Sequence, residues 1–175
     1  MRNLYIVIAA LFLLGSEAWA GVYVEPFVGY ASGTTDFNTK ISTNSITVSS
    51  SFTGLGYGAR AGFKTMMFAF GGEYAEGDFK YKSGGGFKPK DIGAFIGVFA
   101  PLGFRAWGTY FFSAKAGSIK GKAYKLGIGY RFARFMALNL EYLAHSYNDI
   151  TIAPATVSTS AKTYFISLSI PISIP

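Results

Sequence analysis

The chain has 175 residues, of which half are apolar and only 14% are charged, and its formal net charge is +7. A length of this order corresponds to one domain, and so apolar a composition excludes intrinsic disorder. The sequence contains no cysteine, which excludes disulfides and cysteine-based metal sites.

Residues 1–20 are expected to be an export signal. Arg2 supplies a positive start, residues 5–14 are an uninterrupted apolar run, and residues 18–20 (AWA) offer the small side chains that a signal peptidase reads. The alternative is a retained membrane anchor, but the run is about half of the roughly 20 residues that a spanning helix needs. We therefore predict cleavage before Gly21.

The rest of the chain alternates apolar residues with small or polar ones, and a period of two indicates β-strands. In 124–132 (YKLGIGYRF) every second residue is apolar or aromatic, and lysine, glycine and arginine lie between them. Eight such segments are predicted, each close to the roughly 9–11 residues with which a tilted strand crosses a bilayer: 22–31, 52–63, 67–76, 91–100, 104–113, 123–132, 136–146 and 162–172.

The connections between these segments alternate in length. Short turns are expected at 64–66, 101–103 and 133–135, and longer polar loops at 32–51, 77–90, 114–122 and 147–161. Short turns at one end and long loops at the other are typical of an up-and-down barrel. The predicted fold is all-β, an eight-stranded antiparallel up-and-down transmembrane β-barrel that forms one domain over 21–175.

The two faces of these strands could be oriented in either direction. In a soluble barrel the apolar face would be the core, but the opposite face would then expose mostly glycine, which weakens strands. In a membrane barrel the bulky face contacts lipid, and glycine and charge fill a narrow interior. An arginine turned towards the lipid midplane costs about 2–4 kcal/mol, which favours the membrane orientation. The charged residues then expected inside are Glu25, Arg60, Glu73, Asp91, Arg105, Lys125, Arg131 and Glu141.

These interior charges are compatible with two functions. A continuous wet lumen would conduct ions or small solutes as a narrow porin-like channel, whereas salt-bridged charges would close the barrel. Eight strands leave an interior that side chains fill, which favours the closed barrel. Six aromatic residues share the inward parity and would fill it further: Phe27, Phe95, Phe99, Trp107, Phe111 and Phe165.

Residues 92–112 are long and apolar enough to suggest a transmembrane helix instead, and Gly93 and Gly97 have GxxxG spacing. Turn chemistry at 101–103 and the lone Arg105 argue for two strands. The glycine-rich run 83–86 lacks the frame of a phosphate-binding loop, so it is predicted to be a loop tip.

Several segments carry a family resemblance: 22–31 (VYVEPFVGYA), 54–63 (GLGYGARAGF), and 126–132 (LGIGYRF) followed by 136–147 (MALNLEYLAHSY). They resemble the small outer-membrane β-barrel family of OmpA-type and opacity-type proteins. The resemblance covers essentially the whole chain after residue 20. It implies a Gram-negative outer-membrane location with long loops extracellular and short turns periplasmic, and assembly by periplasmic chaperones and the outer-membrane insertion machinery. The family's last strand usually ends in an aromatic residue, whereas this chain ends in ISIP.

The only histidine, His145, raises the possibility of a lipid A-modifying hydrolase, since outer-membrane barrels with a Ser/His/acid site exist. Glu141 and His145 share a strand face, but Ser146 lies on the opposite face, so a regular strand keeps its hydroxyl from the imidazole. Ser113 or Ser167 could approach from another strand. We expect a polar histidine near the barrel rim, and no catalytic residue, cofactor site or metal site.

The long loops and their edges are basic, with nine lysines against four acidic residues, and such a surface attracts anions. Contact with lipopolysaccharide and simple loop solubility both explain this charge, and nucleic acid is not an expected partner of an exported barrel. We expect a non-enzymatic monomer that contacts outer-membrane lipid and lipopolysaccharide, supports envelope integrity and presents its loops for surface interactions. The lysines are Lys40, Lys80, Lys82, Lys88, Lys90, Lys115, Lys120, Lys122 and Lys162.

Overall fold

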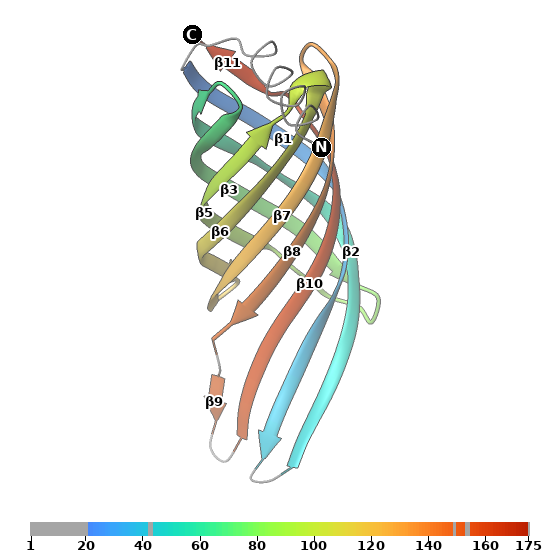
Figure 1. Ribbon diagram of the computed structural model, residues 1–175. Coiled ribbons are helices and arrows are strands. Elements are labelled where there is room, and N and C mark those ends of the chain that lie inside the picture. The colour runs from blue at the N-terminus through green and yellow to red at the C-terminus, as the bar shows by residue number, and fades with distance from the viewer. Residues whose placement is uncertain (1–20, 42–43, 149, 153–154, 175) are drawn as a thin grey trace, which may run out of the picture.

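The computed structural model describes residues 21–41, 44–148, 150–152 and 155–174, so the predicted signal segment 1–20 lies outside the described residues. A single antiparallel sheet closes on itself where the first long strand pairs with the last (Figure 1). Within the described ranges the only helical element is a short 3₁₀ turn, η1 (Pro101–Gly103), and none is a helix long and apolar enough to cross a membrane.

Eight long strands form the ring: β1 (Gly21–Ile41), β2 (Asn44–Thr65), β3 (Phe68–Tyr81), β5 (Pro89–Phe99), β6 (Phe104–Ala116), β7 (Ile119–Ala133), β8 (Met136–Tyr147) and β10 (Ala155–Ser169). Each pairs with the one before it, and β10 pairs with β1. The predicted eight-stranded antiparallel up-and-down barrel is therefore confirmed. Three short strands extend it: β4 (Gly86–Phe87) on β3, β9 (Ile150–Ile152) on β10 and β11 (Ile172–Ile174) on β1.

The outward face of the ring is an apolar band. Along β7, the side chains of Leu126 and Ile128 are 63% and 61% exposed, whereas Lys125, which directly precedes Leu126, is 1% exposed. Aromatic residues border the band at both edges, as in membrane barrels. Tyrosines border it next to the long connections (Tyr30, Tyr57, Tyr74, Tyr110, Tyr124 and Tyr164), and phenylalanines predominate next to the short turns (Phe63, Phe68, Phe104, Phe132 and Phe135).

On β3 and β5, charged side chains reach the outward face beyond Tyr74 and its cross-strand partner Ile92. There the Lys90 ammonium lies 3.1 Å from a Glu76 carboxylate oxygen, and the Tyr74 hydroxyl donates to Glu76 at 2.7 Å. The hydrogen bond from Tyr74, followed by that from Lys90, holds the pKa of Glu76 below its ordinary value. The carboxylate is thus stabilised in its charged form where the apolar band ends.

The polar segment 32–51 is mostly strand, so the prediction of a long loop there was wrong. β1 continues to Ile41 and β2 begins at Asn44, and their Cα pairing is continuous from Ser32 opposite Thr53 to Ile41 opposite Asn44. Beyond the apolar band both faces of a strand contact water, so the hydrophobic period that identifies strands disappears. Strand extensions also occupy parts of 77–90, 114–122 and 147–161, and β1, β2 and β10 extend furthest, at the bottom of Figure 1.

The predicted last strand, 162–172, begins earlier and is interrupted. β10 starts at Ala155 and ends at Ser169, and β11 resumes after Pro171, which has no N–H to donate to the ladder. The helix alternative for 92–112 was also wrong, because this segment forms β5, η1 and β6. The turn between them has positive φ angles at Leu102 (66°) and Gly103 (89°).

Candidate functional site

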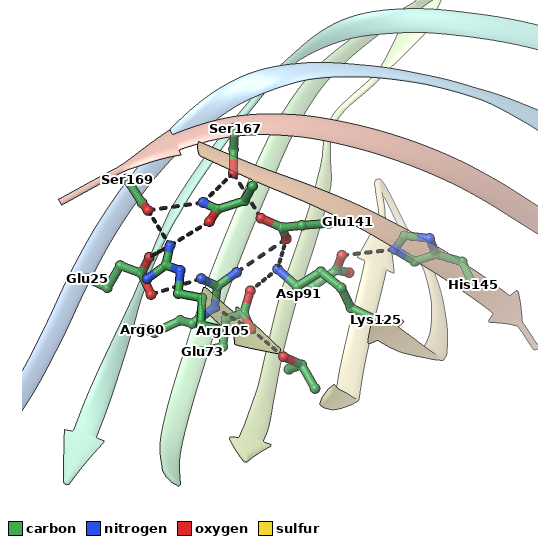
Figure 2. A network of polar contacts seen from close by, with 12 residues as sticks. Glu25, Arg60, Glu73, Asp91, Arg105, Lys125, Glu141, His145, Ser167 and Ser169 are labelled. Carbon is green, nitrogen blue, oxygen red and sulfur yellow. Dashed lines mark hydrogen bonds and ion pairs between the residues drawn. The ribbon is translucent and has the colours of Figure 1, made fainter. Parts of the chain in front are cut away.

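The barrel interior holds three carboxylates and three basic side chains that contact one another. They come from six of the eight ring strands, and each residue is at most 5% exposed. Figure 2 shows them converging across the barrel. We call this cluster the interior ion network: Glu25, Arg60, Glu73, Arg105, Lys125 and Glu141.

Arg60 is the centre of the interior ion network. Its Nη1 lies 3.0 Å from Glu25 Oε2, its Nε 3.3 Å from Glu73 Oε2, and its Nη2 3.2 Å from Glu141 Oε2. The guanidinium also lies over the Trp107 ring, 4.2 Å from its centroid. Because arginine presents five donors in a rigid fork, this one side chain joins β2 to β1, β3 and β8.

The other two bases complete the charge balance. The Lys125 ammonium pairs with Glu73 and lies 2.7 Å from Glu141 Oε2, and Arg105 pairs with Glu25. Three negative charges thus meet three positive charges. A buried charge is costly unless it is paired and hydrogen-bonded, so this balance lets the charges remain inside the barrel.

Sequence reasoning missed the neutral groups that support the network. Ser167 Oγ donates to Glu141 Oε1 at 2.9 Å, Arg105 Nη2 donates to Ser169 Oγ at 2.7 Å, and the Asn139 amide donates to Ser169 Oγ at 3.0 Å. Ser167 and Ser169 lie between outward apolar residues of β10, so their inward parity was readable. The sequence did not indicate which residues these two serines would contact.

Two predicted members do not join the network. Asp91 Oδ2 lies 2.9 Å from His145 Nε2, and Figure 2 shows this pair to one side of the network. Arg131 is exposed at the short-turn end of β7, next to a register shift between Arg131 and Ala133. Parity gives the face of a strand but not the height along the barrel, so Asp91 is buried with a different partner and the predicted interior position of Arg131 is wrong.

His145 is 6% exposed and lies two residues before the end of β8, so it is buried inside the barrel towards its long-connection end. Its ring stacks on Tyr147 with centroids 5.7 Å apart, and its Nδ1 has no hydrogen-bond partner among the described residues. Ser146 is exposed on the outward face, as parity predicted, and Ser167 donates to Glu141. The structure also shows no hydrogen bond between Ser113 and His145 within the described chain.

A metal site also lacks the necessary groups. No three histidine, cysteine or acidic side chains within residues 21–41, 44–148, 150–152 and 155–174 are arranged to hold a metal ion. Asp91 and His145 therefore form a carboxylate–imidazole pair to which no described residue adds a hydrogen-bonded hydroxyl or a third metal ligand.

The long-connection end carries all nine predicted loop lysines, each with an exposed side chain. Two form surface ion pairs of 3.1 Å, Lys88 with Asp78 and Lys90 with Glu76. Lys90 lies directly opposite Lys115 across β5 and β6, and Lys115 lies directly opposite Lys120 across β6 and β7. These three lysines, the lysine row, place like charges side by side on the outward face, an arrangement that is unfavourable without anions.

Comparisons with known proteins identify the fold. No protein-family model matches the chain, and no curated protein matches it. Ail, the attachment invasion locus protein of Yersinia pestis, is similar in structure, with a TM-score of 0.51 and 13% identity over 87% of this chain and 99% of Ail. Ail in complex with the heparin analogue sucrose octasulfate has a TM-score of 0.50 at 14% identity over the same shares. Neisserial surface protein A has a TM-score of 0.48 at 12% identity, over 87% of this chain and 98% of that protein. The likeness to Ail shows that this chain has the fold of the small outer-membrane barrels.

Proposed function

We propose that the chain is a non-enzymatic integral outer-membrane protein of the OmpA or opacity type that supports envelope integrity and presents its long-connection end outside the cell. The interior ion network, enclosed by an outward apolar band, carries this proposal. Such an interior contributes to a closed, rigid barrel, and the band matches a lipid environment.

Packing around the network supports a closed barrel over a channel. Phe27, Phe95, Trp107, Phe111 and Phe165 are at most 7% exposed and fill the space beside the charges. A cavity next to Asp91, Lys125 and Phe165 has a volume of about 30 Å³, comparable to the share of one water in the liquid. A conducting lumen would need a continuous water-filled path past these aromatic side chains and the interior ion network.

Gel mobility and conductance together test the proposal. The chain extracted from outer-membrane fractions should migrate faster unboiled than boiled, because a closed barrel stays compact in detergent, and it should give no current steps in a planar bilayer. A chain that stays soluble in the periplasm and shows no heat-dependent shift would contradict the membrane barrel. Regular current steps would establish the narrow channel instead.

The hydrolase alternative makes a separate prediction about His145. Expression of the unmodified chain should leave the acyl chains of the host's lipid A unchanged, because no described hydroxyl is hydrogen-bonded to the imidazole. Mass spectrometry of lipid A with the unmodified chain, with His145→Ala and without the chain checks this. Loss of an acyl chain that depends on His145 in a barrel that still shows the gel shift would overturn the non-enzymatic assignment.

We further propose that the lysine row contacts the phosphates of lipopolysaccharide. Lys90, Lys115 and Lys120 face outward just beyond the tyrosine border of the apolar band, which is the depth of lipid phosphates in this orientation. The similar Ail structure was solved with a sulfated sugar, a compact polyanion. Bound phosphate groups would relieve the repulsion between the opposed lysines.

A charge-matched pair of double variants tests this contact. Lys115→Gln/Lys120→Gln is expected to weaken lipopolysaccharide binding to the refolded barrel severalfold, with a reduced salt dependence, because two exposed cations near the phosphates are lost. Lys40→Gln/Lys82→Gln removes the same charge from exposed lysines further from the tyrosine border and should leave binding unchanged. Equal weakening by both double variants would show that net charge alone attracts the lipid.

A further inference from the structure

The short-turn end of the barrel contains a cavity of about 890 Å³, which we call the vestibule. It lies between the turns that follow β2, β5 and β7 and the segment that joins β10 to β11. Tyr23 and Phe99, whose rings meet edge to face with centroids 5.5 Å apart, are among the inward residues that line it.

Every charged residue that lines the vestibule within the described chain is basic: Lys64, Arg105, Arg131 and Arg134. The interior ion network is neutral, and the lysines of the opposite end lie among acids such as Asp78 and Glu76. A concave surface with low-dielectric walls and one sign of charge concentrates the electrostatic potential. The vestibule therefore attracts anions.

Arg105 lies where the vestibule meets the interior ion network. Its Nη2 is hydrogen-bonded to Asn139 and Ser169 and pairs with Glu25. Its Nε and Nη1 are buried and have no hydrogen-bond partner among the described residues. Buried donors are rarely left unsatisfied, and the arginine fork is suited to two oxygens of one phosphate or carboxylate group.

The rim of the vestibule lies at the depth of lipid headgroups. Arg131 and Arg134 come from the end of β7 and the turn after it, next to Phe132 and Phe135 of the phenylalanine border. The Lys64 ammonium lies 5.0 Å from the centroid of the Phe99 ring. The rim cations thus stand where the apolar band gives way to water.

We propose that the vestibule binds a phosphate ester, with Arg105 at its inner end and Lys64, Arg131 and Arg134 around the phosphate. A phosphate monoester carries up to two negative charges and several acceptor oxygens, so it matches a set of four cations better than a single carboxylate does. Apolar walls such as Phe99 leave room for the body of the ester. A soluble phosphate monoester presents this chemistry in full, and a phospholipid headgroup of the adjoining leaflet, which is a phosphodiester, presents phosphate oxygens with one negative charge. The inference goes beyond the proposed function, which assigns anion contact only to the opposite end of the barrel.

Two binding measurements on the full folded chain distinguish these sources. Calorimetric titration with sn-glycerol 3-phosphate in zwitterionic detergent tests for a soluble ester, and native mass spectrometry from nanodiscs of mixed phosphatidylglycerol and phosphatidylcholine tests for a headgroup. Arg131→Gln/Arg134→Gln should weaken the observed binding about tenfold or more, because two exposed cations around the phosphate are lost. Lys40→Gln/Lys82→Gln removes the same charge from exposed lysines outside both proposed sites and should bind like the unmodified chain.

Each outcome decides the proposal. Weaker binding in Arg131→Gln/Arg134→Gln alone supports the proposal. Weaker binding in the calorimetric titration identifies a soluble ester as the source of the phosphate, and weaker binding in the nanodisc measurement identifies a lipid headgroup. Failure of the unmodified folded chain to bind either probe would overturn the proposal, and so would equal loss in the two double variants. The heat-dependent gel shift of each variant confirms folding, so failure of the vestibule proposal is separable from failure of the barrel assignment.

Discussion

Replacing Arg60 with methionine is expected to destabilise the barrel by about 3–5 kcal/mol, because breaking a buried ion cluster by removing one partner leaves uncompensated charge. Glu25, Glu73 and Glu141 would all lose the guanidinium that they share. The free energy of unfolding, measured by urea titration of the refolded barrel, checks the size of the effect. The temperature at which the compact form disappears on an unboiled gel should fall in parallel.

Two further variants identify the cause of that loss. Arg134→Met removes an exposed arginine outside the network and should change stability by less than about 0.5 kcal/mol. Arg60→Met combined with Glu141→Gln makes the network neutral again and should recover part of the lost stability. If Arg60→Met were no more destabilising than Arg134→Met, the network would not be a main source of barrel stability.

Gly127→Ala is expected to destabilise the barrel by about 1–3 kcal/mol through overpacking of the interior. A Cβ at this position would lie 2.3 Å from Cζ2 of Trp107, whose ring in turn lies beneath Arg60. The methyl group would therefore displace the indole and disturb the cation above it. In a chain that begins at Gly21, Trp107 is the only tryptophan, so its fluorescence should shift to longer wavelength together with the loss of stability.

Gly108→Ala is the matched control on the neighbouring strand. Its Cβ would meet only Leu126 Cδ2, at an ordinary distance of 3.6 Å, and Lys125 O at 3.9 Å. Alanine should be neutral or slightly stabilising there, because glycine loses more conformational freedom on folding. In addition, Gly127→Ala should lower the free energy of unfolding by less in a Trp107→Leu background than in the unmodified chain. Equal stability of the two alanine variants would contradict the close approach of Trp107 to Gly127.

The faces of the strands were predictable because lipid and a narrow interior impose opposite demands on successive residues. Leu126 and Lys125 illustrate this, because adjacent residues of a strand point to opposite faces. Leu126 therefore faces outward and Lys125 faces the interior ion network. The prediction failed where that contrast ends, at 32–51, because a strand in water on both faces has no hydrophobic period. Arg131 has the interior parity of β7 but lies beyond the packed interior, so the alternation of residues along β7 did not predict that Arg131 is exposed.

The sequence alone determined the number of ring strands, the faces of the strands within the apolar band and the all-β barrel architecture, because these follow from a period of two and from turn chemistry. Only the tertiary structure decided which charges meet. Asp91 pairs with His145, and Arg60 rather than Arg105 gathers three carboxylates. Partners across a barrel depend on strand tilt and on height along the axis, which are properties of the closed sheet and of no single strand. The vestibule has the same origin, because it brings together basic residues from β2, β6, β7 and the following turn that are up to 70 positions apart in the chain.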